Sequence, residues 1–229
     1  MKLRELVTAV AGLICAFALV AGQQTPVDPQ KANPRTPTPP AVKRPKPEPF
    51  DGASVERMNS QCVTLESAEG NILLEMYADA APETVRNFLN LVSIGAFDTT
   101  VFNRVVKDFV VQGGSLGAHE KLTRELVDRG RRTIPDEPNY VKHERGVLSM
   151  ARPDTPNGAT TDFFILIRDA KHLDGTFAAF GRVRTGMEIV DRINAQEVNG
   201  DKPAKPVRIA RAIVSTCPAA APVTPAVSN

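Results

Sequence analysis

The sequence has few of the residues that build metal sites. Among 229 residues there are three cysteines and three histidines, and no Cys-x-x-Cys motif occurs. The histidines His119, His143 and His172 lie far apart, and no two of them have the i, i+4 spacing of a helical zinc site. We therefore predict neither a metal ion nor another cofactor.

Two other chemical signatures are also missing. No Gly-x-Ser-x-Gly elbow is present, although Ser149, Asp174 and a histidine could be assembled into a hydrolytic triad. Ser149 is better explained as part of a packed strand. The pair Gly113 and Gly114 is too short for a phosphate-binding loop and fits a tight turn.

The charge is nearly balanced. Residues 1–60 contain 8 Lys and Arg against 5 Asp and Glu, and because the whole chain has 28 against 26, the remainder has 20 against 21. No stripe of basic residues interleaved with aromatics occurs, so nucleic acid is not an expected partner.

The amino-terminal residues 1–22 are typical of a signal peptide or a short membrane anchor. Lys2 and Arg4 precede the uncharged apolar run Leu6–Ala21, and small residues follow near Gly22. The run is short for a membrane span, which needs about 20 apolar residues. We therefore expect an extracytoplasmic protein, in a bacterial periplasm, that is membrane-anchored if this segment is not cleaved.

Proline dominates the next segment. Residues 23–50 hold nine of the 19 prolines together with several basic residues, and residues 23–58 are predicted to be a disordered basic linker. It could tether the protein to an anionic surface, although a solvated spacer is favoured. Residues 218–229 are predicted to be a disordered Ala/Pro tail, which leaves residues 59–217 for one domain.

The sequence of this domain predicts many short strands and two amphipathic helices. Pro82–Ile94 carries apolar residues at i, i+3, i+4 and i+7, and Thr185-x-x-Glu188 has the form of a capping box that opens the second helix. A third, short helix is possible within Glu120–Arg129. The predicted strands lie at 62–65, 70–77, in the region around Arg104 that a Lys107-Asp108 break interrupts, and at 146–150, 163–167, 177–183 and 207–214. This pattern indicates a mainly β protein whose antiparallel sheet closes on itself beneath helical lids.

One strand carries an arginine among apolar residues. In Phe102–Gly114, FNRVVKDFVVQGG, alternation places Phe102, Arg104 and Val106 on one face. A buried arginine is rare unless it is paired or faces a ligand. An arginine whose head reaches solvent from an apolar stem is the alternative.

Four blocks in order resemble the cyclophilin family of peptidyl-prolyl cis-trans isomerases. They are FNRVVKDFVVQGG, GVLSMAR at 146–152, FFI at 163–165, and LDG followed by FGRV at 173–183. The resemblance implies a closed eight-stranded antiparallel β-barrel capped by two α-helices. It also implies a monomer, of the exported bacterial type, that binds Xaa-Pro segments of unfolded or exported polypeptides and interconverts their cis and trans forms.

The resemblance also assigns site residues. Arg104 matches the family's catalytic arginine. The substrate-binding positions that the resemblance suggests are Phe109, Val110, Gln112, Ala151, Arg152, Asp162, Phe164, His172, Leu173 and Phe177.

Several of these positions depart from the family pattern. Asn103 and Phe177 replace histidines, Asp162 replaces a glutamine, His172 replaces a tryptophan, and Val110 stands where methionine is frequent. Because that tryptophan contacts cyclosporin in the family, we predict reduced cyclosporin affinity with activity retained.

The implied reaction fits the residues present. Rotation about a peptide bond has a barrier of ~18–20 kcal/mol that arises from amide resonance, and no bond has to break. No nucleophile or general base is needed. A charged donor aimed at the prolyl amide and a dry apolar pocket are sufficient, and arginine suits the first role.

Two further expectations accompany the resemblance. The terminal strands of such barrels are antiparallel neighbours, so Cys62 and Cys217 would come together, and in an oxidising compartment a disulfide would form. Two reduced thiols are the alternative. The alternative function is a proline-motif binding or scaffold module with little turnover.

Overall fold

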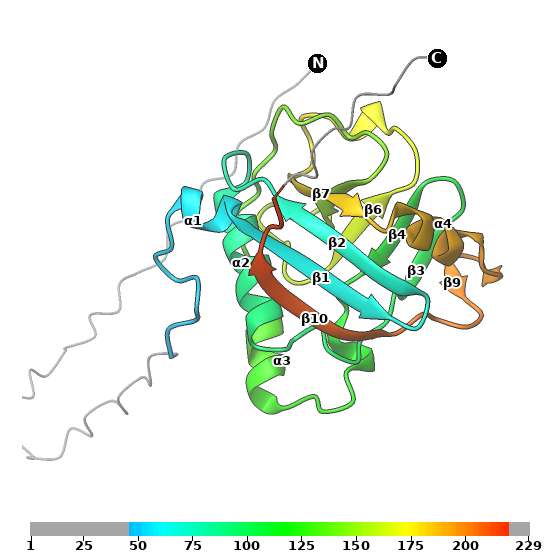
Figure 1. The fold of residues 1–229 in the computed structure, drawn as a ribbon, viewed down its shortest axis with the longest axis horizontal. Coiled ribbons are helices and arrows are strands. Elements are labelled where there is room, and N and C mark those ends of the chain that lie inside the picture. The colour runs from blue at the N-terminus through cyan, green and yellow to red at the C-terminus, as the bar shows by residue number, and fades with distance from the viewer. Residues whose placement is uncertain (1–45, 220–229) are drawn as a thin grey trace, which may run out of the picture. The chain divides into compact units, whose positions relative to one another are not determined.

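The computed structural model describes residues 46–219, and these form one antiparallel eight-stranded sheet beside a small two-stranded one (Figure 1). The order of the large sheet is β10-β1-β2-β7-β5-β6-β4-β3, and β8 pairs with β9. The strands are β1 (Gln61–Ser67), β2 (Gly70–Met76), β3 (Arg104–Val106), β4 (Val110–Gly113), β5 (Val147–Met150), β6 (Phe163–Leu166), β7 (Ala179–Thr185), β8 (Val198–Asn199), β9 (Lys202–Pro203) and β10 (Ile209–Thr216).

Four α-helices occur in this part of the chain: the predicted pair, a short helix in the region of Glu120–Arg129, and one that was not predicted. They are α1 (Val55–Asn59), α2 (Pro82–Ser93), α3 (Arg124–Gly130) and α4 (Met187–Ala195), and the short 3₁₀ turns η2 (Leu116–Ala118) and η3 (Lys171–Leu173) accompany them. The predicted pair corresponds to α2, which packs against β10 and β7, and α4, which packs against β2, β3 and β4. None of these helices is long and apolar enough to cross a membrane.

The prediction of a closed barrel is wrong at one seam. β3 and β10 are the two edges of the sheet, and only an isolated bridge between Val101 and Arg208 joins the segments beside them. β3 has three residues, and the amide of its central residue, Val105, donates to the Asp201 carbonyl of a loop at 2.8 Å. The edge of β3 is thus occupied by a turn where a closing strand would have to pair.

The core consists of two apolar clusters. The larger one lies between the sheet and α2 and is centred on Phe88, whose ring centroid is 5.4 Å from that of Phe97 and 5.3 Å from that of Phe163. The smaller one includes Val110, Phe164 and other residues of β4, β5, β6 and η3. This second cluster underlies the site described below.

Helix α2 follows the prediction closely. Pro82 is its first residue, where a missing amide proton is tolerated. Ala81 offers no capping side chain, and the Glu137 carboxylate instead accepts from the amides of Glu83 at 3.0 Å and Thr84 at 2.7 Å. The Val85 and Phe88 side chains are buried.

The predicted capping box at Thr185 is wrong. Helix α4 begins at Met187, and its N-cap is Gly186, with φ 92° and no side-chain capping bond. A Cβ at Gly186 would lie 2.4 Å from the Asn71 carbonyl oxygen, so β7 and β2 approach too closely for another residue. Thr185 is still part of β7 and pairs with Leu73.

The ordered domain begins earlier than residue 59. Phe50, Ala53 and Met58 are buried in the larger core cluster, and the Phe50 amide donates to Asn90 Oδ1 at 2.8 Å. The described part of the predicted linker is therefore ordered, because its apolar side chains cover α2. The predictions for residues 1–45 and 220–229, which include the signal or anchor, lie outside the described residues.

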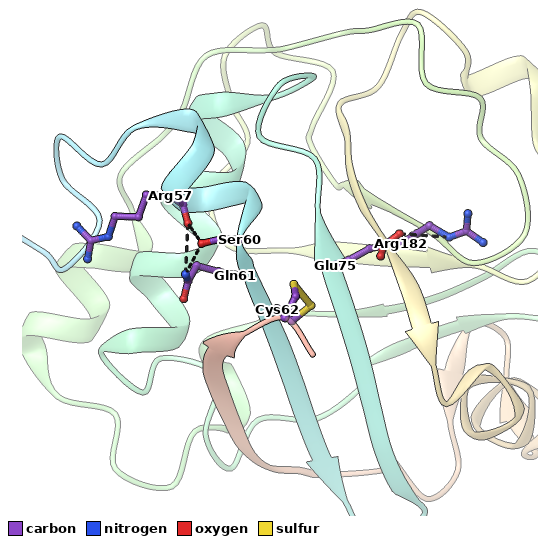
Figure 2. Close-up of a disulfide and its surroundings, with 7 residues drawn as sticks. Arg57, Ser60, Gln61, Cys62, Glu75 and Arg182 are labelled. Carbon is purple, nitrogen blue, oxygen red and sulfur yellow. Dashed lines mark hydrogen bonds and ion pairs between the residues drawn. A yellow bond between two sulfur atoms is a disulfide. The ribbon is translucent and has the colours of Figure 1, made fainter. Parts of the chain in front are cut away.

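Cys62 and Cys217 are joined by a disulfide that connects β1 to the residue after β10 (Figure 2). Their Cα atoms are 4.8 Å apart, within the ordinary range. Cys62 pairs with Ser215 across the two strands, and the Cys217 amide donates to the Ser60 carbonyl at 2.9 Å. The disulfide therefore lies at the end of the β1–β10 pairing and holds the two strands together there.

Candidate active site

A cavity of about 200 Å³ lies where β3, β4 and β6 meet the loops that follow β5 and η3. Its lining contains nine of the eleven residues that the sequence assigned to catalysis and substrate binding. They are Arg104, Phe109, Val110, Gln112, Ala151, Arg152, Phe164, Leu173 and Phe177. Residues far apart in the chain therefore line one cavity.

Arg104 lies at the polar side of this cavity. It is the first residue of β3 and pairs with Gln112 of β4, so the two side chains share one face of the hairpin. The Arg104 Nη1 group donates to Gln112 Oε1 at 3.4 Å, and the arginine side chain is 42% exposed. The guanidinium is therefore held at the rim, in reach of a molecule in the cavity.

Strand alternation holds only within β3. Val106 packs against the smaller cluster beside the cavity, and Val105 is buried in the larger one. Phe102, which the sequence placed on the face of Arg104, is also buried in the larger cluster because it precedes the strand.

The opposite side of the cavity is apolar. Phe164 is only 7% exposed and Leu173 8% exposed, and Val110 is buried beside them. The Phe177 ring stands edge-on to Phe164, with the ring centroids 6.1 Å apart. Because β4 pairs with β6, Gln112 is opposite Phe164, so the polar and apolar sides are set by one strand register.

A turn places Phe109 at the cavity. β3 ends at Val106, and Asp108 adopts a positive φ of 56°, which aspartate tolerates better than most residues. The Phe109 amide donates to the Val106 carbonyl at 3.1 Å, which closes the turn. Lys107 and Asp108, which separate the two apolar runs of this segment, therefore belong to a tight turn.

Ala151 and Arg152 follow β5 and complete the lining. The Ala151 amide donates to the Asp162 carbonyl at 3.0 Å. The Arg152 guanidinium carbon lies 5.1 Å from the centroid of the Phe177 ring, a cation–π arrangement. Arg152 thus covers the phenylalanine that replaces the family's histidine.

Two assigned residues do not line the cavity. His172 is exposed, and its ring centroid lies 5.6 Å from that of Phe109. Asp162 lies behind Gln112. Burial raises the pKa of its carboxyl, and hydrogen bonds from the Gln112 and Thr161 side chains oppose that rise. His172 therefore extends one wall outward, and Asp162 supports Gln112 from outside the cavity.

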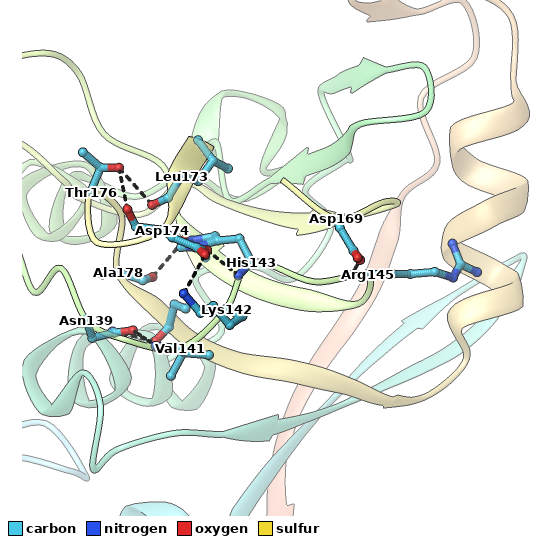
Figure 3. A network of polar contacts seen from close by, with 12 residues as sticks. Asn139, Val141, Lys142, His143, Arg145, Asp169, Leu173, Asp174, Thr176 and Ala178 are labelled. Atoms are coloured by element: carbon cyan, nitrogen blue, oxygen red, sulfur yellow. Dashed lines mark hydrogen bonds and ion pairs between the residues drawn. The ribbon is translucent and has the colours of Figure 1, made fainter. Parts of the chain in front are cut away.

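A second group of polar residues is brought together beside the cavity (Figure 3). His143 Nε2 lies 3.1 Å from Ser149 Oγ, and His143 Nδ1 lies 3.3 Å from Asp174 Oδ1. These are the residue types of a hydrolytic triad. However, Ser149 is completely buried in β5, and its hydroxyl also donates to the Ala178 carbonyl at 3.0 Å. The nucleophile such a triad needs is therefore inaccessible, in keeping with a packed strand residue.

Burial also controls the ionisation of this group. The buried environment lowers the pKa of His143, and the Asp174 carboxylate opposes that effect. The pKa of Asp174 is lowered, first by the hydrogen bond from the His143 amide and also by Lys142. No cluster of three or more His, Cys, Asp and Glu that could hold a metal ion occurs within residues 46–219.

One contact of the site was missed by sequence reasoning. Asp201, in the turn between β8 and β9, accepts from Arg104 Nε at 3.0 Å and lies 2.9 Å from Arg104 Nη2. It is 97 residues from Arg104 along the chain. The sequence carries no periodicity or motif that would connect the two.

Comparisons with known proteins agree with this geometry. Residues 62–214 match the family model described as cyclophilin type peptidyl-prolyl cis-trans isomerase/CLD. The chain is 36% identical over 156 residues to peptidyl-prolyl cis-trans isomerase cypE of Dictyostelium discoideum, which covers 68% of this chain and 98% of the relative. It is 35% identical over 141 residues to peptidyl-prolyl cis-trans isomerase B of Escherichia coli, which covers 57% of this chain and 82% of the relative.

A solved structure is also similar. A Cryptosporidium parvum cyclophilin type peptidyl-prolyl cis-trans isomerase, crystallised in the presence of the dipeptide Ala-Pro, superposes with a TM-score of 0.60 at 26% identity. The match covers 68% of this chain and 99% of that structure. With the family model, the relatives and the fold in agreement, this chain belongs to the cyclophilin family of peptidyl-prolyl cis-trans isomerases.

Proposed function

We propose that this isomerase seats the proline ring of an Xaa-Pro segment in the cavity over Phe164 and Leu173, while Arg104 stabilises the twisted amide. The observation that carries the proposal is the single cavity that Arg104 shares with Phe109 and Phe164. The ring would lie against apolar side chains, and the charged donor would reach the amide from the rim.

Isomerisation requires only an apolar surface for the proline ring and a charged donor for the amide. As the amide twists, resonance is lost and the prolyl nitrogen becomes a better hydrogen-bond acceptor. A guanidinium held in place and shielded from water stabilises that charge more than it stabilises the planar amide. Lowering the barrier by about 7–8 kcal/mol would accelerate isomerisation roughly 10⁵–10⁶-fold.

The substrates in this proposal are proline-containing segments of unfolded, exported polypeptides. A related enzyme was crystallised in the presence of Ala-Pro, which supports a proline-containing ligand. The signal-like residues 1–22 support an extracytoplasmic setting, in a periplasm, with the proline-rich segment as a tether if the signal is retained. A monomer and reduced cyclosporin affinity remain predictions from the sequence.

The test is a cis-to-trans assay on an Ala-Pro peptide. Arg104→Ala should lower kcat/KM by about 10²–10³-fold, the range seen when one charge-stabilising donor is removed. Arg192→Ala is the matched control, because Arg192 is an exposed arginine of α4 that pairs with Glu69 at 3.5 Å, away from the cavity. It should keep wild-type activity.

The same assay separates the enzyme from the alternative. If wild type and Arg104→Ala have equal, low rates but both bind a proline peptide, the cavity is a binding or scaffold module with little turnover. If both are equally fast, Arg104 is not the catalytic group.

A further inference from the structure

The Arg104 guanidinium is held from two sides by residues of different parts of the chain. On one side, Asp201 Oδ2 accepts from Nε at 3.0 Å and is 2.9 Å from Nη2. On the other, Gln112 Oε1 accepts from Nη1 at the longer distance of 3.4 Å. A guanidinium has five N–H groups. Within residues 46–219 these contacts use three of them, which leaves one on each terminal nitrogen for a substrate.

Asp201 is itself fixed to the strand that carries Arg104. Its carbonyl accepts from the Val105 amide at 2.8 Å, one residue beyond Arg104. It lies in the turn of the β8–β9 hairpin, where Asn199 pairs with Lys202 and Gly200 adopts a φ of 62°. β9 packs against β3 (Figure 1). The carboxylate is thus positioned by backbone contacts before any substrate arrives.

The Arg104–Asp201 ion pair contributes little to the stability of the fold. The Arg104 and Asp201 side chains are 42% and 53% exposed, and ion pairs of that exposure contribute little to stability. Its effect on orientation is larger, because an arginine side chain loses much rotamer entropy when it is ordered. An Asp201 carboxylate that restrains Nε and Nη2 removes much of that cost before the transition state forms.

We propose that Asp201 is a positioning residue for Arg104, and that it acts on turnover by fixing the guanidinium toward the cavity. The inference rests on the proposed function, since it assumes that Arg104 is the catalytic donor. Asp201 does not line the cavity, so it acts through Arg104 and not on the peptide. Among the described residues, the Asp201 carboxylate contacts the Arg104 guanidinium and no other side chain.

This role predicts a specific kinetic pattern in the cis-to-trans assay. Asp201→Ala should lower kcat about tenfold and leave KM within about twofold, because the orientation matters most in the transition state. Asp201→Asn keeps an oxygen acceptor of the same size, so it should recover most of that loss. Asp191→Ala is the matched control. Asp191 binds Arg145 through two contacts of 2.8 and 2.6 Å and is 43% exposed, but it lies on α4 outside the cavity.

A double-mutant cycle separates positioning from a structural role. In the Arg104→Ala background, Asp201→Ala should change kcat less than twofold, because the group on which it acts is gone. A further tenfold loss in that background would overturn the inference, and so would wild-type kcat for Asp201→Ala alone. Failure of the proposed function looks different: there Arg104→Ala itself would keep full activity.

Discussion

Two polar sites lie one strand apart in this protein and differ in almost every physical respect. The cavity carries Arg104 at a solvent-exposed rim. The neighbouring network carries His143 and Ser149, which are 1% and 0% exposed. The sites are joined through the pairing of Ser149 on β5 with Phe164 on β6. By residue type, the network is the more obvious catalytic candidate.

The comparison shows that access and direction decide which site can act. The Ser149 hydroxyl is already bonded to the Ala178 carbonyl, and its other neighbour is His143. No substrate atom can approach it. Arg104 is no nucleophile, but its side chain is 42% exposed and lines the cavity together with the apolar Phe164 and Leu173. We infer that the network supports the wall of the cavity, because Asp174 follows Leu173 directly and holds the His143 amide at 2.8 Å.

The largest expected effect is on stability and comes from the disulfide, which lies outside both sites. Removing the crosslink with Cys62→Ala and Cys217→Ala together should lower the free energy of unfolding by roughly 4–5 kcal/mol, because the disulfide closes a loop with a sequence separation of 155. Isomerase activity of the folded fraction should stay unchanged, since neither cysteine lines the cavity.

Urea unfolding measures this, with and without a reductant. The reductant should destabilise only the wild type. If it leaves the wild-type midpoint where it was, Cys62 and Cys217 are not crosslinked in the purified protein.

The intermediate effect concerns the network alone. Ser149→Ala should lower the free energy of unfolding by about 1–3 kcal/mol, because the Ala178 carbonyl and His143 Nε2 both lose a buried partner. It should lower kcat/KM less than tenfold. Urea unfolding and the peptide assay on the same preparation measure the two quantities. A variant that is stable but inactive would indicate that the network of His143, Ser149 and Asp174 carries the catalytic group.

The smallest effect is a pH dependence. Burial lowers the pKa of His143 below its ordinary value of 6.5, so the unfolded chain binds more protons than the folded one just below that pH. The stabilisation is therefore fully present above about pH 6.5 and is lost as the pH falls toward the folded-state pKa. Two titratable groups act on His143: Asp174 raises its pKa and His172 lowers it. Lys142 in turn lowers the pKa of Asp174.

Unfolding midpoints between pH 7 and pH 5 measure this dependence. His143→Gln is the control, and it should flatten the part of the profile that His143 causes. The same slope in the variant would assign the dependence to another group. Asp162 is not a candidate, because burial raises the pKa of its carboxyl and its contribution to stability would grow as the pH falls.

The residue pattern predicted a strand around Arg104, and this arginine is the first residue of β3. The site roles of Arg104 and of the residues around it came from the family resemblance, because their arrangement depends on how turns form and how distant strands pair. α2 was predictable from its apolar stripe and Pro82.

The parts that failed depend on contacts between distant segments. The Arg104–Asp201 pair joins residues with no shared pattern, and the open seam between β3 and β10 arises because a loop carbonyl takes the Val105 amide. The start of the domain was missed because Phe50 and Met58 gain their burial only from α2. In each case the deciding partner lies far away in the chain.

One measurement tests the central claim most directly: kcat/KM for cis-to-trans isomerisation of one Ala-Pro peptide by wild type, Arg104→Ala and Ser149→Ala under the same conditions. We predict that Arg104→Ala loses about 10²–10³-fold and Ser149→Ala less than tenfold. The reverse order, with Ser149→Ala inactive and Arg104→Ala close to wild type, would contradict the account.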